Sequence, residues 1–225
     1  IDQIFEDVAN CDDLVPYYAA KFEETPEDIE FLVKASGLLK STKCTESDLY
    51  FNMSVKLNSL EPTADRAYTL AKRVNNDEKL NEAVVYYEQA IELQEDDLQK
   101  AIYYLELGDV TRRLGDYPKA RTYALKSIEL DATSGYPYLL IGNIYAASSK
   151  SCSEEEFEQK AVYWAAVDKF AKAKSVDPEL TSDADRFIEA YKPHFPDNET
   201  IFFYNLKQGA TYTVGCWINE RTTVR

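Results

Sequence analysis

The sequence predicts an all-α fold in which pairs of helices repeat along the chain. Small and large apolar residues recur with a period close to 34 residues, and self-similarity at that length is typical of helical repeat arrays. Glycine is scarce, with 7 residues, while tyrosine is abundant, with 17, which favours packed amphipathic helices over a turn-rich β architecture. Of the 225 residues, 45% are hydrophobic, which is enough to bury a substantial core.

The clearest unit covers residues 101–134, where two predicted helices flank a turn at Gly115. Small side chains at Gly108, Ala120 and Ser127 would let the two helices approach closely, while larger side chains fill the space between neighbouring pairs. The preceding segment repeats these packing positions. They are Ala67, Leu70 and Ala71 on one helix and Ala83, Tyr87 and Ala90 on the next.

Both segments resemble the tetratricopeptide repeat, a 34-residue helix–turn–helix unit whose packing positions these residues occupy. The resemblance implies a right-handed α-solenoid of about 3.5–4 helix pairs over residues 1–192, which works as a protein-binding scaffold. The predicted units are 1–26 (truncated), 27–63 (degenerate), 64–100, 101–134 and 135–180, followed by a capping helix at 181–192. Residues Ile1–Val8 have the pattern of the end of an amphipathic helix, so we infer that sequence is missing upstream.

An insertion near residues 147–158 interrupts the last unit. The packing positions Gly142 and Ala166 lie 24 residues apart, whereas the equivalent Gly108 and Ala120 lie 12 apart. Ser153 stands three residues before a glutamate, which is capping-box spacing. We therefore expect the second helix of this unit to start at Ser153 and to be unusually long.

The C-terminal segment, residues 193–225, departs from the helical pattern. Ile201–Leu206 and Thr211–Ile218 are rich in aromatic and β-branched residues and are joined through a short segment containing Gly209. They predict a β-hairpin that covers the end of the array. The alternative is an extended tail lying along the last helices.

The four cysteines can be assigned by their position in the repeat. Cys11 and Cys44 fall near equivalent turns of consecutive units, which are neighbours in a solenoid. Cys152 lies in the insertion and Cys216 in the predicted hairpin, so a bond between them would hold the tail to the array. Two disulfides would indicate an oxidising compartment, and the alternative is four reduced cysteines in a cytosolic protein.

Charge and composition exclude several function classes. With 25 basic and 40 acidic residues the formal charge is -15, which disfavours nucleic acids and anionic membrane surfaces. No apolar run approaches the length of a membrane-spanning helix. His194 is the only histidine and has no CxxC or HxxxH companion, and no phosphate-binding loop occurs, so we expect no metal, no cofactor and no catalytic residues.

The resemblance implies that first helices line a concave groove where a partner protein or peptide binds. The residues at the positions that would point into the groove are Tyr68, Lys72 and Asn75, then Leu105, Asp109 and Arg112, then Tyr136, Leu139 and Asn143, with Asp65, Ile102 and Ala146 at the remaining ones. Some tetratricopeptide-repeat domains hold a peptide's terminal carboxylate with Lys and Asn side chains. Lys72, Arg112 and Asn143 match that arrangement only in part, and the alternative is that the two cations pair with carboxylates such as Asp109.

The segment Ala161–Phe170 and the tail also resemble exported tetratricopeptide-repeat proteins of Gram-negative bacteria. That resemblance implies a periplasmic or cell-envelope location. The leading hypothesis is thus a non-catalytic, exported scaffold that binds a protein or peptide. The alternative is a structural or self-association module supporting an upstream domain, and an enzyme is the third reading.

Overall fold

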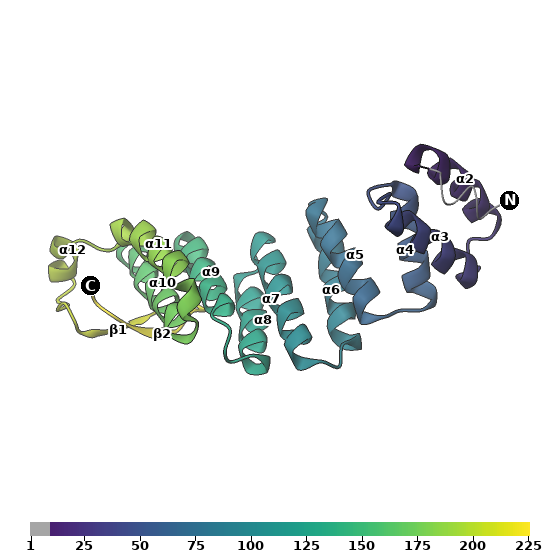
Figure 1. Cartoon of the computed structure of the whole chain (residues 1–225). Coiled ribbons are helices and arrows are strands. Elements are labelled where there is room, and N and C mark those ends of the chain that lie inside the picture. The colour runs from purple at the N-terminus through teal and green to yellow at the C-terminus, as the bar shows by residue number, and fades with distance from the viewer. Residues whose placement is uncertain (1–9) are drawn as a thin grey trace. The chain divides into compact units, whose positions relative to one another are not determined.

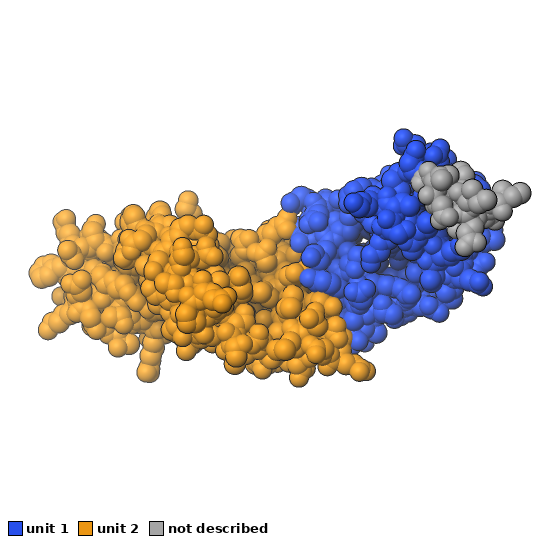
Figure 2. All heavy atoms as spheres, viewed as in Figure 1, with its two compact units in different colours: residues 1–93 blue, residues 94–225 orange. Residues whose placement is uncertain are grey.

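The computed structural model describes residues 10–225, and the chain divides into two compact units (Figure 2). Unit 1 comprises residues 1–93 and unit 2 residues 94–225. The helix end expected at Ile1–Val8 lies outside the described residues. Both units are built mainly from helices, so the all-α prediction is confirmed.

Unit 1 is a run of short helices joined by tight turns (Figure 1). Its helices are α2 (Cys11–Glu24), α3 (Ile29–Ser41), α4 (Asp48–Leu60), α5 (Ala64–Asn76) and α6 (Leu80–Leu93). Helices α2, α3 and α4 share one core in which Leu14, Leu32 and Met53 are fully buried. Helices α5 and α6 pack against each other as a pair.

Unit 2 continues the helical pattern and carries the strands. Its elements are α7 (Asp97–Arg113), α8 (Tyr117–Leu130), α9 (Tyr136–Cys152), α10 (Glu156–Val176), the 3-10 turns Pro178–Leu180 and Lys192–His194, α11 (Thr181–Tyr191), α12 (Asn198–Phe203), β1 (Thr211–Val214) and β2 (Glu220–Thr223). Helix α7 packs on α8, and α9 on α10. The largest core cluster centres on α9 and α10, where Ile144, Tyr145 and Phe170 are fully buried.

Side-chain caps set the starts of many helices. The caps that accept a hydrogen bond from the backbone N–H three residues on include Asp28, Ser47, Thr63, Asp96 and Asp116. Such caps satisfy amide groups that have no partner within the helix. Between α7 and α8, Gly115 has a φ of 85°, a left-handed conformation that favours glycine, directly before the Asp116 cap. At the turn expected at Gly115, α7 therefore ends and α8 begins within a few residues.

Helix α10 begins at Glu156, so the prediction that it starts at Ser153 is wrong. Ser153 has an extended backbone and terminates α9, and its hydroxyl accepts a hydrogen bond from the Glu155 amide at 3.1 Å. That bond closes a short turn rather than capping a helix three residues on. From its later start α10 runs for 21 residues, so the insertion lengthens this helix as expected.

The C-terminal hairpin exists, but its strands differ from those expected. Strands β1 and β2 pair antiparallel, with Thr211 opposite Thr223 and Val214 opposite Glu220. Ile201–Leu206, expected as the first strand, is instead largely the helix α12, and the predicted strand Thr211–Ile218 ends at Val214. Asp197 caps α12 by accepting a hydrogen bond from the Thr200 amide at 2.8 Å, so local capping prevails over β propensity.

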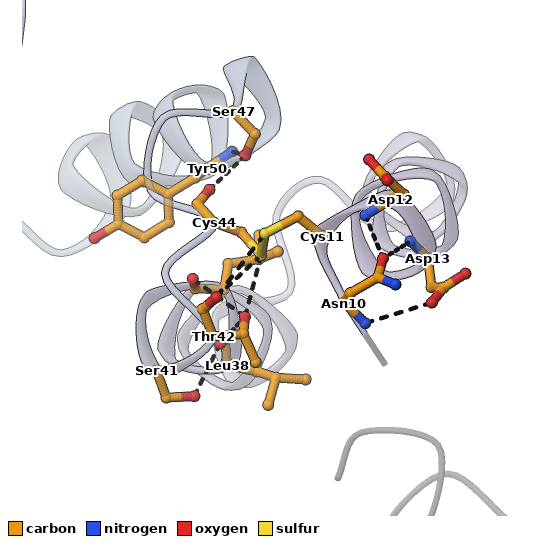
Figure 3. Close-up of a disulfide and its surroundings, with 11 residues drawn as sticks. Asn10, Cys11, Asp12, Asp13, Leu38, Ser41, Thr42, Cys44, Ser47 and Tyr50 are labelled. Carbon is orange, nitrogen blue, oxygen red and sulfur yellow. Dashed lines mark hydrogen bonds between the residues drawn. A yellow bond between two sulfur atoms is a disulfide. The ribbon is translucent and has the colours of Figure 1, made fainter. Parts of the chain in front are cut away.

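One disulfide lies within each unit, with the pairing expected from the repeat. In unit 1, Cys11 at the start of α2 bonds Cys44 in the turn between α3 and α4, with a Cα–Cα distance of 5.5 Å. Figure 3 shows the capping box of Asn10 and Asp13 beside this bond, and Thr42 next to the two sulfur atoms. The bond joins the first turn of α2 to the α3–α4 turn.

In unit 2, the disulfide Cys152–Cys216 joins the last residue of α9 to the turn between β1 and β2, with a Cα–Cα distance of 5.4 Å. Cys216 and Asn219 both have positive φ, of 53° and 45°, within that turn. This disulfide therefore attaches the hairpin to the helical array.

A cluster of polar side chains, which we call the Glu220 cluster, holds the hairpin from three helices. Glu220 on β2 lies 2.9 Å from Arg121 of α8 and 2.5 Å from Lys169 of α10. The hydroxyl of Tyr145 on α9 donates to the same carboxylate at 2.6 Å, and burial first, then this bond, raises the pKa of Tyr145, which keeps the hydroxyl a donor. Arg121 also donates to the Ile218 carbonyl at 2.9 Å. Successive helices thus converge on one carboxylate.

Helices α9 and α10 approach so closely at Gly142 that a side chain there would collide with the core. A Cβ atom at this position would lie 2.4 Å from Phe170, whose ring is stacked on Phe187 and Tyr191 and has little room to move. We expect Gly142→Ala to lower the free energy of unfolding of unit 2 by about 1 to 3 kcal/mol, the usual cost of overpacking. Urea unfolding followed by tryptophan fluorescence measures this, because both tryptophans, Trp164 and Trp217, lie in unit 2.

The matched control is Gly37→Ala in α3. Nothing lies within 4 Å of a Cβ atom built at Gly37, so alanine should improve helix propensity without a clash, by about 0.5 to 1 kcal/mol. Circular dichroism follows this change, since unit 1 contains no tryptophan. An unchanged midpoint for Gly142→Ala would contradict the close contact between α9 and α10.

Candidate functional site

Four of the residues expected in the groove, Asp109, Arg112, Asn143 and Ala146, come together in unit 2. They line a hollow of about 370 Å³, whose wall includes residues of α7, α9 and α11. The lining residues are Asp109 and Arg112 of α7, Leu140, Asn143, Ala146 and Ala147 of α9, and Tyr191 of α11. The hollow therefore combines an ion pair, an amide and an aromatic ring with a small apolar surface.

The packing of α7 against α9 places these side chains. Helical periodicity puts Leu105, Asp109 and Arg112 on one face of α7, while Leu107 and Val110 are fully buried on the other. At Gly108 a Cβ atom would lie 3.0 Å from Leu140, so the glycine leaves room for the α9 side chain. Because Leu140 packs there, the α9 face with Asn143 and Ala147 lies beside the α7 face with Asp109.

The cationic residues of the site are engaged within their own helices. The guanidinium of Arg112 makes two contacts of 2.9 Å with the Asp109 carboxylate, from Nε and from a terminal nitrogen. On α5 of unit 1, the Lys72 ammonium lies 5.4 Å from the centre of the Tyr68 ring. The alternative of pairing with a neighbouring carboxylate thus applies to Arg112, and this pair presents both charges at the edge of the hollow.

The other expected residues of unit 2 differ in how much surface they offer. Tyr136, at the start of α9, has 54% of its surface exposed, and Leu105 is half-buried against the core. Leu139 is only 8% exposed and belongs to the core cluster, so it supports the site rather than offering a partner a surface.

Two hollows of unit 1 are lined mainly by residues outside the predicted groove positions. Tyr68 and Asn75 on α5 are half-buried, and Tyr68 packs edge-on against Tyr87 of α6. One hollow of about 220 Å³ is lined by residues of α3, α4 and α5, among them Tyr50, Ser54, Asp65, Arg66 and Thr69. Of the expected groove positions, this lining contains Asp65 and neither Tyr68, Lys72 nor Asn75.

A second hollow of unit 1, of about 280 Å³, shares Tyr50, Ser54 and Thr69 with the first and adds Arg73. Arg73 pairs with Glu46 at 2.6 Å and with Asp77 at 3.3 Å. These residues were not predicted, because the repeat pattern assigns faces of first helices and does not describe the contact between α4 and α5 across two units of the repeat.

His194 packs on an aromatic ring, and the acidic residues form no metal-binding group in the part of the chain that the structure describes. His194 is exposed and stacks on Tyr163 with ring centres 5.0 Å apart. Over residues 10–225, no group of three or more His, Cys, Asp or Glu side chains is placed to hold a metal ion. In the same range, no helix combines the length and the apolar character needed to cross a membrane.

Comparison with known proteins agrees with the repeat. A family model described as tetratricopeptide repeat matches residues 75–97 and 101–134, which cover α6, most of α7 and α8. No curated protein sequence is significantly similar to the chain. Two solved structures have a similar fold, a crystal structure of MamA and a crystal structure of MamA protein, each 21% identical to this chain.

The first of these has a TM-score of 0.53 and aligns with 73% of this chain and 87% of its own. For the second the TM-score is 0.54 and the shares are 76% and 85%. At this identity the likeness concerns the fold, and the fold agrees with the repeat that the family model detects. The chain therefore carries tetratricopeptide repeats at residues 75–97 and 101–134 within an all-α architecture.

Proposed function

We propose that this protein is a non-catalytic scaffold that binds a segment of another protein in the hollow between α7, α9 and α11. Stacked helical repeats provide extended surfaces for protein partners, which supports this class of function. The observation that carries the proposal is the convergence of Asp109, Arg112 and Asn143 on one hollow of about 370 Å³.

The chemistry of the hollow suits a peptide in an extended conformation. The Asn143 amide offers a donor and an acceptor, as a peptide group requires, and Leu140 with Ala146 and Ala147 gives a small apolar surface for one side chain. The Asp109–Arg112 pair can rearrange to meet a charge of either sign. Tyr191 contributes a ring that is held by stacking on Phe170.

The test is to fill the hollow. Ala147 is exposed and lines it, so Ala147→Trp blocks the hollow without disturbing the core. We expect this variant to lose a bound partner from cell-envelope extract by about tenfold, as judged by quantitative mass spectrometry of captured proteins. Asn143→Ala should reduce the binding of the same partner less, since it removes only the amide.

The matched control is Ala132→Trp, at an exposed position of unit 2 between α8 and α9. Its set of captured proteins should equal that of the unchanged protein. If Ala147→Trp retains every partner that Ala132→Trp retains, the hollow is not the binding site. Light scattering of the unchanged protein addresses the second hypothesis, since a stable oligomer would favour a self-association module.

We further propose that the protein acts in the periplasm or cell envelope. Two disulfides in a chain of this size support an oxidising compartment, because cytosolic thiols are kept reduced. Mass spectrometry of non-reduced protein isolated from its native host should find both pairs oxidised. Four free thiols in that protein would contradict export.

A further inference from the structure

The helix α12 lies near the C-terminal end of unit 2 (Figure 1), and adjacent aromatic residues at its end are exposed. Phe202 and Phe203 have 82% and 77% of their surface exposed, and the neighbouring Tyr204 has 40%. Large apolar side chains placed together on the surface mark interaction sites more often than isolated ones do. Phe203 and Tyr204 also line a hollow of about 440 Å³ that is separate from the one between α7, α9 and α11.

Buried and stacked side chains anchor the helix that carries the aromatic surface. Ile201 is buried with Phe157 and Trp164 in a small core, and the Tyr204 ring stacks on Phe157 with centres 4.1 Å apart. Asp197 caps the helix through the Thr200 amide. Because these contacts anchor the helix, its backbone loses little conformational entropy when a partner binds.

The same hollow carries an excess of negative charge. Four carboxylates line it, against one lysine. They are Glu155, Glu156, Asp197 and Glu199, and the lysine is Lys160. Lys160 lies 2.7 Å from Glu156 and so is already paired. Hydrogen bonds from Thr200 hold the pKa of Asp197 below its usual value, in line with a carboxylate that carries its negative charge.

We propose that this surface docks a basic segment of another protein, in which a lysine or arginine stands next to an apolar residue. The cation would enter the acidic hollow and contact the Tyr204 and Phe203 rings, while the apolar neighbour would cover Phe202. A second copy of this chain is a poorer occupant, because both copies carry a formal charge of -15. Anionic lipid is repelled for the same reason.

The probe is a short fluorescent peptide in which lysine alternates with leucine, titrated with the full chain and followed by fluorescence anisotropy. We expect the Phe202→Ser/Phe203→Ser double variant to weaken peptide binding about tenfold or more, because it removes the aromatic anchors at the centre of the interface. The Glu155→Gln/Glu199→Gln variant should weaken binding about fivefold, because it removes charges at the rim. A counterpart peptide with glutamate in place of lysine should not bind.

Two control variants separate this site from general attraction to an acidic protein. Val85→Ser/Leu98→Ser removes two apolar side chains that are 62% and 58% exposed, and Glu92→Gln/Glu179→Gln removes two exposed carboxylates elsewhere. Both controls should bind the peptide as the unchanged protein does. Equal weakening in the site variants and the controls would overturn the proposal.

Two further measurements complete the test. If sedimentation shows a dimer and the Phe202→Ser/Phe203→Ser variant is monomeric, the occupant is a second copy of the chain and the proposal is wrong. It is also wrong if anionic vesicles bind through these residues. The Ala147→Trp variant should keep full affinity for the basic peptide, since it fills the other hollow. The two proposals, binding in the hollow between α7, α9 and α11 and docking on the aromatic surface of α12, can therefore fail independently of each other.

Discussion

The double variant Cys11→Ser/Cys44→Ser is expected to lower the free energy of unfolding of unit 1 by about 3 to 4 kcal/mol. The two residues are 33 positions apart, and a cross-link over a loop of that length removes this much chain entropy from the unfolded state. The bond also holds α2 to the hydrophobic core that it shares with α3 and α4. Hydrogen exchange followed by mass spectrometry measures the effect, as lost protection in α2, α3 and α4.

The peptides of α9 and α10 provide the internal control for this experiment, since their own disulfide, Cys152–Cys216, is intact. Their protection should stay the same. Unchanged protection of α2 in the double variant would show that the bond adds nothing to the stability of unit 1.

Replacing Glu220 by alanine is expected to destabilise unit 2 by about 2 to 4 kcal/mol. The change leaves Arg121 and Lys169 facing each other without their shared carboxylate, and it removes the acceptor of the Tyr145 hydroxyl. Removing one partner from a largely buried charge cluster lowers the free energy of unfolding by more than the intact cluster adds to it. The reason is that the remaining charges are then neither paired nor fully solvated. Tryptophan fluorescence during urea unfolding reports the change, since Trp217 packs beside Tyr145.

The matched control is Glu129→Ala on α8. Glu129 also pairs with a lysine, Lys126, at 2.7 Å, but both side chains are largely exposed, at 62% and 50%. Water screens such a pair, so the unfolding midpoint should not change measurably. If Glu220→Ala behaves like Glu129→Ala, the cluster does not hold the hairpin.

The helical part of the fold could be predicted because small residues must stand where helices touch. Gly108, Ala120 and Ser127 are all buried, and Ser127 donates to the Ala101 carbonyl at 2.8 Å between α8 and α7. Steric limits of this kind recur with the repeat and leave a period in the sequence. The pairing of the cysteines followed from the same period.

The tail was harder to predict because two local preferences compete there. The segment from Ile201 to Tyr204 is aromatic and β-branched, as strands are, yet Asp197 after Pro196 starts a helix. Only Ile201 of the helix is buried, so the β propensity summed over the segment says little about its secondary structure. A cap followed by threonine three residues on was the signal that could have identified α12.

The candidate site was predicted in part. The family pattern gave four residues that line one hollow, because they lie on first helices that pack directly. They are Asp109, Arg112, Asn143 and Ala146. The pattern could not give Tyr191, which reaches the hollow from α11, outside the repeat unit. Leu139 was assigned to the surface by its register, but the packing of α9 buries it.

The Glu220 cluster also bears on how the C-terminal part would respond to mechanical load. Arrays of helical repeats can be pulled apart one unit at a time, because each unit touches only its neighbours. Here β2 is tied at once to α8, α9 and α10 through Arg121, Tyr145 and Lys169. We therefore expect that tension applied to β2 would be shared by three helices at once, so that unit 2 would unfold in one step rather than helix by helix.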